Sequence, residues 1–194
     1  MDTEGLVKRL FETNGHRGPM LSTYLRDDQK LSEHFSLYEL TVTTNAPLQQ
    51  ANRTLNDEQV EKLKALAEQA ERIRKICEAP IVINSGYRGD ALNTLTAGSS
   101  RTSQHTKCEA IDFYAKGLAH EVVFQKLLDM ARQGSFTFGQ LILERAARSY
   151  GTATWIHCSV IGTLDPVKVG QAMIMNAGID GKQHYRLVEQ LKFK

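Results

Sequence analysis

A long amphipathic segment in the first half of the chain constrains the fold more than any other feature. It runs from about Asn56 to Glu78, and either Asn56 or Asp57 is suited to cap its first turn. Its apolar residues recur at spacings of three and four, as on one face of a helix: Val60, Leu63, Ala67, Ala70, Ile73 and Cys77. Pro80 ends the helix, and the β-branched run 81–84 predicts a buried strand directly after it. Because such a helix must bury its apolar face, we expect it to pack against a second layer.

The strands of that second layer lie mainly in the second half of the sequence. Residues 109–115, "EAIDFYA", alternate as a strand does, and residues 119–134 predict a helix. The β-rich runs 138–144 and 152–160 are joined by "RAARSYG", which predicts a hairpin. This order predicts an α+β fold, with N-terminal helices packed on a mainly antiparallel sheet.

The flanking segments carry weaker signals. Ser36 is followed three residues later by Glu39, the pattern of a capping box at the start of a short helix. The other expectations are a short helix at 3–13, irregular chain at 41–55, a long loop with one helical turn at 90–108, a weak strand at 169–175 and a helix or solvated tail at 187–194.

Charge and cysteine content exclude several classes of protein. The 24 basic and 22 acidic side chains give a net charge of only +2, which does not favour a nucleic-acid partner. No apolar run approaches the length needed for membrane insertion, and the N-terminus lacks the pattern of a signal peptide. We therefore expect synthesis in a cytoplasm. The three cysteines are widely spaced without a CxxC motif, which favours reduced thiols over a disulfide framework.

The segment "SQHTKCEAIDF" and the later "WIHCS" contain candidate metal ligands. His105 precedes the predicted strand that holds Asp112, and His157 lies on a separate strand. Two histidines and one carboxylate leave a fourth position open on a tetrahedral zinc ion, as in catalytic sites. The spacing alone is not specific, because most histidines in a chain of this size lie at the surface or form hydrogen bonds in the core.

Four segments, in order, resemble the zinc D-Ala-D-Ala carboxypeptidases, a family that includes phage endolysins. "SQHTKCEAIDF" is similar to the family motif S-x-H-x-x-G-x-A-x-D, and "INSGYRGDALN" resembles the segment upstream of it. "LSEHFSLYELT" resembles the opening of the phage-encoded and tail-associated branch, and "FGQLILE" with "WIHCS" resembles its closing hairpin. The resemblance covers residues 31–160. It implies a hedgehog-like peptidase domain with extensions at 1–30 and 161–194.

The resemblance also implies roles for individual residues. By it, His105, Asp112 and His157 are the ligands of Zn²⁺. Arg88 resembles the arginine that binds the substrate carboxylate or steadies the oxyanion, although a surface salt bridge in a turn is the alternative. The residues expected to line the substrate site are Ser85, Tyr87, Ser103, Gln104 and Trp155.

The sequence departs from the family pattern at the catalytic base. Many members carry an acidic residue three positions before the last histidine, where this chain has Thr154. We expect Glu144 to replace it as general base, from a position opposite Thr154 if the hairpin turns near Ser149 and Tyr150. Alternatively, Glu144 ends a strand at the surface or pairs with a neighbouring arginine.

Cys108 is a second departure, because the family has glycine there. The glycine is expected to serve a positive φ or close packing. A cysteine at this position is either a fourth metal ligand or a small buried hydrophobic residue. Cys158, next to His157, is expected to point to the opposite face of its strand.

The resemblance thus implies a zinc peptidase that cleaves peptidoglycan stem or cross-link peptides, as a D,D- or L,D-carboxypeptidase or endopeptidase. It is expected to be phage-encoded, made in the host bacterial cytoplasm, and to act at the cell wall or within a virion. The alternative is a virion or tail structural protein that keeps the fold with reduced activity and contacts other phage structural proteins. A host peptidase for free dipeptides is a third possibility.

Overall fold

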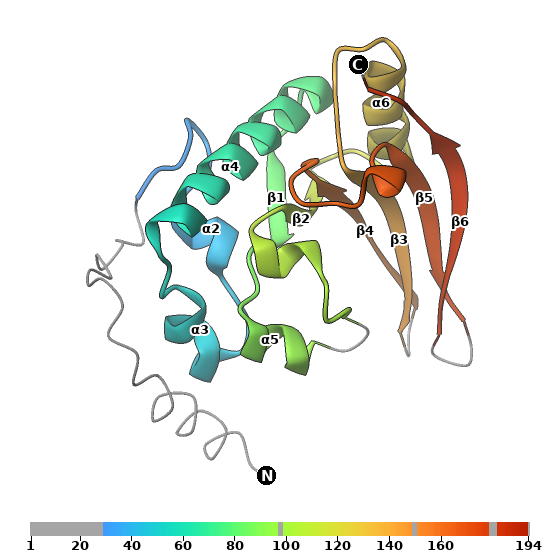
Figure 1. Ribbon diagram of the computed structural model, residues 1–194. Helices are drawn as coiled ribbons and strands as arrows, with labels where there is room; N and C mark the ends of the chain where they lie inside the picture. Colours follow the sequence, from blue (N-terminus) through green and yellow to red (C-terminus); the bar gives the residue numbers. More distant parts are fainter. Residues whose placement is uncertain (1–28, 97–98, 149–150, 179–181, 194) are drawn as a thin grey trace.

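The computed structural model describes residues 29–96, 99–148, 151–178 and 182–193 (Figure 1). Its α-helices are α2 (Leu37–Thr41), α3 (Ala46–Asn52), α4 (Asp57–Cys77), α5 (Asp90–Leu95) and α6 (His120–Arg132). Its strands are β1 (Ile81–Ser85), β2 (Ala110–Ala115), β3 (Gln140–Arg148), β4 (Gly151–Ser159), β5 (Gln171–Ala177) and β6 (Gln183–Gln190). The described residues also form the 3₁₀ helices η1 (Gln104–Lys107) and η2 (Pro166–Lys168). The helix predicted at 3–13 lies outside the described residues.

The strands form one sheet in the order β1-β2-β4-β3-β5-β6. Every neighbouring pair is antiparallel except β3 and β5, which run parallel. The predicted α+β class with a mainly antiparallel sheet is therefore confirmed.

Helices cover one face of this sheet. The helix α4 packs on β1 and β2, and α6 packs on β2, β3 and β4. Between them lies the main hydrophobic core, to which β2 contributes Ile111 and Phe113, and β4 contributes Ile156 and Cys158. Alternate residues of the same strands therefore point to the other face of the sheet. That face carries Asp112 and His157, and we call it the site face.

The long helix α4 begins where the sequence predicts. The side-chain oxygen of Asn56 accepts a hydrogen bond from the backbone N–H of Gln59, and the side-chain oxygen of Gln59 accepts one from the backbone N–H of Asn56. The equivalent pair, Ser36 and Glu39, caps α2. Both caps satisfy backbone N–H groups that a helix leaves open at its first turn.

The structure corrects two local expectations. The segment 41–55 is not irregular throughout, because α3 forms within it, with a proline in its first turn where the missing N–H costs nothing. The end of the chain is not a helix or tail at 187–190, because β6 pairs there with β5. Both elements depend on partners elsewhere in the chain. Among the described residues, no helix combines the length and apolarity needed to cross a membrane.

Candidate metal centre

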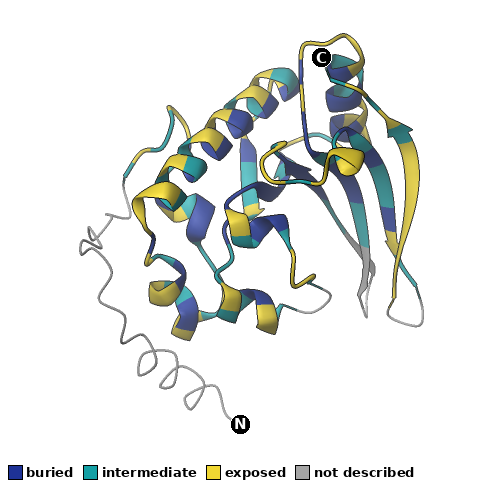
Figure 2. Cartoon of the chain, in the orientation of Figure 1, coloured by how far each residue is buried: buried dark blue, intermediate teal, exposed yellow. Residues whose placement is uncertain are grey.

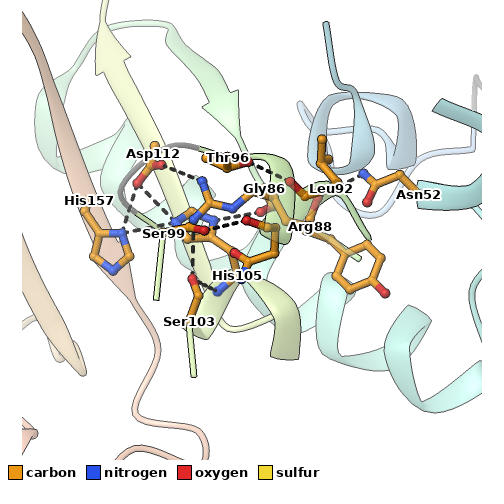
Figure 3. A network of polar contacts seen from close by, with 12 residues as sticks. Asn52, Gly86, Arg88, Leu92, Thr96, Ser99, Ser103, His105, Asp112 and His157 are labelled. Atoms are coloured by element: carbon orange, nitrogen blue, oxygen red, sulfur yellow. Dashed lines mark hydrogen bonds and ion pairs between the residues drawn. The ribbon is translucent and has the colours of Figure 1, made fainter. Parts of the chain in front are cut away.

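Three predicted ligands converge on the site face of the sheet. His105 lies in η1, Asp112 in β2 and His157 in β4, where Asp112 and His157 are direct cross-strand neighbours. One potential ligand atom from each side chain lies within 4.8 Å of those from the other two. The side chains of all three point toward one another (Figure 3).

The distances within the cluster fit a bound cation. Asp112 Oδ1 lies 2.9 Å from His157 Nδ1 and 3.2 Å from His105 Nε2. His105 Nε2 lies 3.2 Å from His157 Nδ1. The Nδ1 of His105 is 2.7 Å from the carbonyl oxygen of Gly86, which only accepts, so Nδ1 carries the proton and donates. In a neutral His105 ring, Nε2 then directs a lone pair at the carboxylate oxygen, and two acceptors this close need a proton or a cation between them.

The electrostatics of Asp112 also suit a ligand. Burial by itself would raise the pKa of this carboxyl group. The opposing effect of His105 and His157 is larger, so the net pKa falls below its usual range. Asp112 is therefore an anion at neutral pH, as metal coordination requires.

Backbone of the loop after β1 holds His105 in place. Besides the Gly86 carbonyl bond to its ring, the backbone N–H of Arg88 donates to the His105 carbonyl oxygen at 3.1 Å. Gly86 itself packs against α2 so closely that a Cβ atom there would collide with the Leu40 carbonyl group. Only glycine permits this approach.

A buried asparagine fixes the same loop from the other side. Asn52, at the end of α3, donates from Nδ2 to the carbonyl oxygens of Thr41 and Tyr87, at 2.7 and 3.0 Å. Its Oδ1 accepts from the backbone N–H of Gly89 at 2.7 Å. Sequence reasoning gave no role to Asn52 and treated Gly86 only as part of a turn. The one available signal was the glycine within "SGYR".

Arg88 lies beside the three-residue cluster (Figure 3). Its Nη1 is 3.8 Å from Asp112 Oδ2, and its Nη2 donates to the Ser103 hydroxyl at 3.3 Å. Burial lowers the pKa of Arg88 from its ordinary value, whereas the charges of Asp112 and Glu144 act to raise it. The Nε–H of Arg88 is buried without a hydrogen-bond partner in the structure. The guanidinium thus retains a donor that no protein group satisfies.

Glu144 pairs with Trp155, not with Thr154 as expected. Residues 149 and 150, where the turn is predicted, lie outside the described residues, but Arg148 pairs with Gly151, which sets Arg145 opposite Thr154. The corrected register matters, because cross-strand partners share a face and one residue of slip reverses the face. It puts Glu144 on the site face with His157, and Thr154 on the core face with Ile156.

The surroundings of Glu144 change its acidity. Burial and the Asp112 carboxylate raise the pKa of Glu144 to about 7, although His157, Arg88 and the Trp155 indole act to lower it. Glu144 does not pair with Arg145, whose guanidinium instead contacts Glu121 at 2.8 Å. A carboxyl group with this pKa exchanges protons near neutral pH.

The two cysteines near the cluster belong to the hydrophobic core. Cys108 has a φ of 60°, in the left-handed region, and its side chain is buried. Within the described residues, the cluster that can hold a metal comprises His105, Asp112 and His157, without Cys108. Cys158 lies on the core face, opposite to His157.

The residues predicted to line a substrate site take different positions. Ser85 is the cross-strand neighbour of Asp112, and Ser103 accepts from Arg88 and from the backbone of His105. Trp155 is half-buried beside Glu144 on the site face. Tyr87 packs in the core, and its hydroxyl accepts from Gln59 of α4 at 3.0 Å. Gln104 is buried in η1, and its Nε2 has no hydrogen-bond partner in the structure.

Comparison with known proteins identifies the family. Residues 33–159 match the family model described as Peptidase M15, which spans α2 through β4 and all three clustered side chains. No curated protein matches the chain. The family model covers more than half of the 194 residues, so the chain belongs to the Peptidase M15 family.

Proposed function

We propose that the chain is a zinc-dependent peptidase that cleaves stem or cross-link peptides of peptidoglycan. Membership of the Peptidase M15 family implies a metallopeptidase acting on peptides of this type. The observation that carries the proposal is the convergence of two imidazoles and one carboxylate beside Glu144 and Arg88.

The donor set suits zinc. His105, Asp112 and His157 would hold the ion, and two nitrogens with one oxygen leave one tetrahedral position for water or substrate. When bound, zinc lowers the pKa of a water molecule and polarises the carbonyl group of the peptide. The Gly86 carbonyl keeps His105 in the tautomer whose Nε2 is free to coordinate.

Glu144 is the proposed general base. Its carboxylate would take a proton from the attacking water and return it to the amine that leaves. A pKa near 7 favours both transfers, because the group is then neither too weak a base nor too weak an acid. Thr154 has no acid–base chemistry at this pH and points to the core face.

Arg88 is the proposed anion-binding residue. Its largely buried guanidinium lies beside the cluster, 3.8 Å from Asp112 Oδ2, and its Nε–H has no hydrogen-bond partner in the structure. A planar guanidinium binds a carboxylate with two parallel hydrogen bonds. This suits either a terminal carboxylate of the peptide or the oxyanion that forms at its carbonyl group.

The proposed setting is bacteriophage infection, with synthesis in the host cytoplasm and action at the cell wall or within a virion. It is supported by the resemblance of residues 31–41 and of the β3–β4 hairpin to the phage-encoded branch.

The test is hydrolysis of purified peptidoglycan and synthetic stem peptides by zinc-loaded protein, with products identified by mass spectrometry. We expect Glu144→Gln to keep one zinc per chain and to lose activity by about 10²- to 10⁴-fold. Glu121→Gln is the matched control, because it makes the same change at an exposed residue paired with Arg145. If zinc-bound wild-type protein releases no product, the proposal of an enzyme is refuted and the role of a virion or tail structural protein is favoured.

A further inference from the structure

A second apolar surface lies on the site face of the sheet, away from the main core. Ile142 and Met175 are buried, with exposures of 5% and 1%, yet neither belongs to the main core cluster. Their sequence neighbours Leu141, Leu143 and Ile174 pack in or against that core. Since side chains alternate along a strand, Ile142 and Met175 point to the site face.

Strand register connects these residues to the metal cluster in two rows. One row crosses the sheet from Asp112 through His157, Ile142 and Met173 to Leu187. The other runs from Trp155 through Glu144 and Met175 to Tyr185. Residues in direct register share a face, so both rows lie on the site face. We call Ile142, Trp155, Met173, Met175, Tyr185 and Leu187 the apolar strip.

The outer end of the apolar strip is open to solvent. Tyr185 and Leu187 are 51% and 52% exposed. They belong to the edge strand β6, most of which is exposed (Figure 2). A register shift between β5 and β6 places Glu189 opposite Ala172, on the core face, and there Glu189 pairs with Arg132 of α6. Within the strip, the side chains that a peptide can contact are the exposed Tyr185 and Leu187 and the partly buried Trp155 and Met173, whereas Ile142 and Met175 are buried. Contiguous exposed apolar side chains mark binding sites.

Electrostatics support the connection between β6 and the cluster. Burial raises the pKa of the Tyr185 hydroxyl, and the carboxylates of Glu144 and Asp112 raise it further. The hydroxyl also donates to Gln183 at 2.9 Å on the same strand. The carboxylates of Glu144 and Asp112 therefore act on Tyr185, although β6 is the last strand of the sheet.

In the sheet order, the metal cluster on β2 and β4 has β1 on one side and β3, β5 and β6 on the other. Arg88 follows β1, on one side of the cluster, whereas β3, β5 and β6 extend from the other side. If Arg88 holds an anionic group at the carboxyl end of the peptide, residues before the scissile bond must extend across β3 toward β6. The aliphatic side chains and the extended backbone of the peptide would contact the strip there.

We propose that the apolar strip binds the residues of the substrate peptide on the amino-terminal side of the scissile bond. This inference rests on the proposed peptidase function. The strands β5 and β6 lie beyond residue 159, where the match to the family model ends. The outer part of the strip is thus supplied by a segment outside the matched domain, and it sets the preference for longer peptides.

The test compares two synthetic peptides that share the leaving residue but carry one or three aliphatic residues before the scissile bond. Zinc-loaded wild-type protein, Tyr185→Ala and Leu187→Ser are assayed for kcat and KM on both. We expect each variant to lose on the order of tenfold in kcat/KM on the long peptide, through KM, and to match wild type on the short one. Arg186→Gln is the control, since it lies exposed on the same strand but on the opposite face.

The outcomes separate this inference from the proposed function. Equal losses on both peptides, or no loss on either, would overturn the role of the strip. If wild-type protein cleaves neither these peptides nor purified peptidoglycan, the proposed function fails; if it cleaves only peptidoglycan, the proposed function stands. In both cases calorimetric titration of the long peptide tests the strip alone. Binding that weakens about tenfold in Tyr185→Ala supports the strip, and the absence of binding to wild type overturns it.

Discussion

At Cys108 the backbone adopts a conformation that few side chains tolerate. Its φ of 60° ends η1, where its N–H bonds to the carbonyl groups of Gln104 and His105. The resembled family has glycine at this position, which is the residue that a left-handed conformation favours. Cys108 therefore adopts the left-handed conformation that ends η1, the segment that contains His105, although this conformation is strained for a residue with a side chain. Its thiol packs in the core.

Substitutions of Cys108 distinguish a role of its side chain in core packing from a role as a metal ligand. We expect Cys108→Gly to be at least as stable as Cys108→Ala, because glycine relieves about 1 kcal/mol of backbone strain that alanine keeps. Both variants should keep one zinc per chain. Urea unfolding and metal analysis measure these outcomes, and loss of zinc in both variants would identify Cys108 as a ligand.

Glu144 should make the stability of the metal-free protein depend on pH. Its pKa is raised from 4.5 to about 7 on folding, so its protonated form stabilises the native state fully below pH 4.5. That contribution is lost as pH rises through 7. Relative to Glu144→Gln, the wild-type protein should lose up to about 3 kcal/mol between pH 4.5 and pH 8.

Urea unfolding of both proteins in a chelator, at several pH values, measures this difference. Glu121→Gln should show no such loss, because contact with Arg145 lowers the pKa of Glu121. A difference that stays constant with pH would mean that Glu144 is solvated in the native state.

At the scale of elements, the turn after β1 determines the geometry of the centre. Gly86 contacts α2 through its backbone and holds the His105 ring through its carbonyl oxygen. Tyr87 donates its backbone N–H to the Leu40 carbonyl oxygen at 2.7 Å, and Asn52 ties the same turn to α3. The candidate metal centre therefore depends on α2 and α3, which supply none of its three clustered side chains.

Gly86→Ala should damage the centre without touching a ligand. The added methyl group collides with the Leu40 carbonyl, so the turn must move and with it the acceptor for His105. We expect a loss of about 1–3 kcal/mol in stability and of about 10- to 100-fold in zinc affinity. Competition with a chromophoric chelator measures the affinity.

Gly89→Ala is the matched control for this variant. A Cβ atom at Gly89 would meet its nearest neighbour at 3.5 Å, an ordinary contact. Zinc affinity that is unchanged in Gly86→Ala would show that the Gly86 carbonyl does not position His105.

At the scale of the molecule, a metal ion would connect parts of the chain that are distant in sequence. The 3₁₀ helix η1 and the strands β2 and β4 each contribute one side chain, and His105 and His157 are 52 residues apart. The three side chains are buried and lie within hydrogen-bonding distance of one another, and the Gly86 carbonyl and Arg88 contact them from outside the cluster. Metal binding to the native state alone would stabilise the whole fold.

Zinc should raise the thermal unfolding temperature, and chelation should reverse the change. At a free zinc concentration of a thousand times the Kd, the stabilisation is about 4 kcal/mol. His105→Ala should lose this response. His34→Ala, which removes a histidine that contacts Glu71 on α4, should keep it. Calorimetric scans with and without zinc measure the effect, and a full response in His105→Ala would place the metal elsewhere.

The sequence by itself determined the elements whose signals are local. The periodicity and caps of α4, the strand after Pro80 and the alternation around Asp112 depend on neighbouring residues, so they could be predicted. The four short segments also indicated the family and the three residues that converge. The α3 helix and β6 could not be predicted, because their stability comes from contacts with distant parts of the chain.

Only the tertiary structure decided which face each side chain takes and what surrounds it. The pairing of Arg148 with Gly151 sets Glu144 opposite Trp155 and on the face of His157, one residue away from the expected partner Thr154. The raised pKa of Glu144, the Gly86 carbonyl behind His105 and the two apolar rows reaching β6 likewise need the assembled sheet. The physical reason is that burial, charge proximity and cross-strand register are properties of residues brought together by folding, while helix caps and strand alternation are already present in the unfolded sequence.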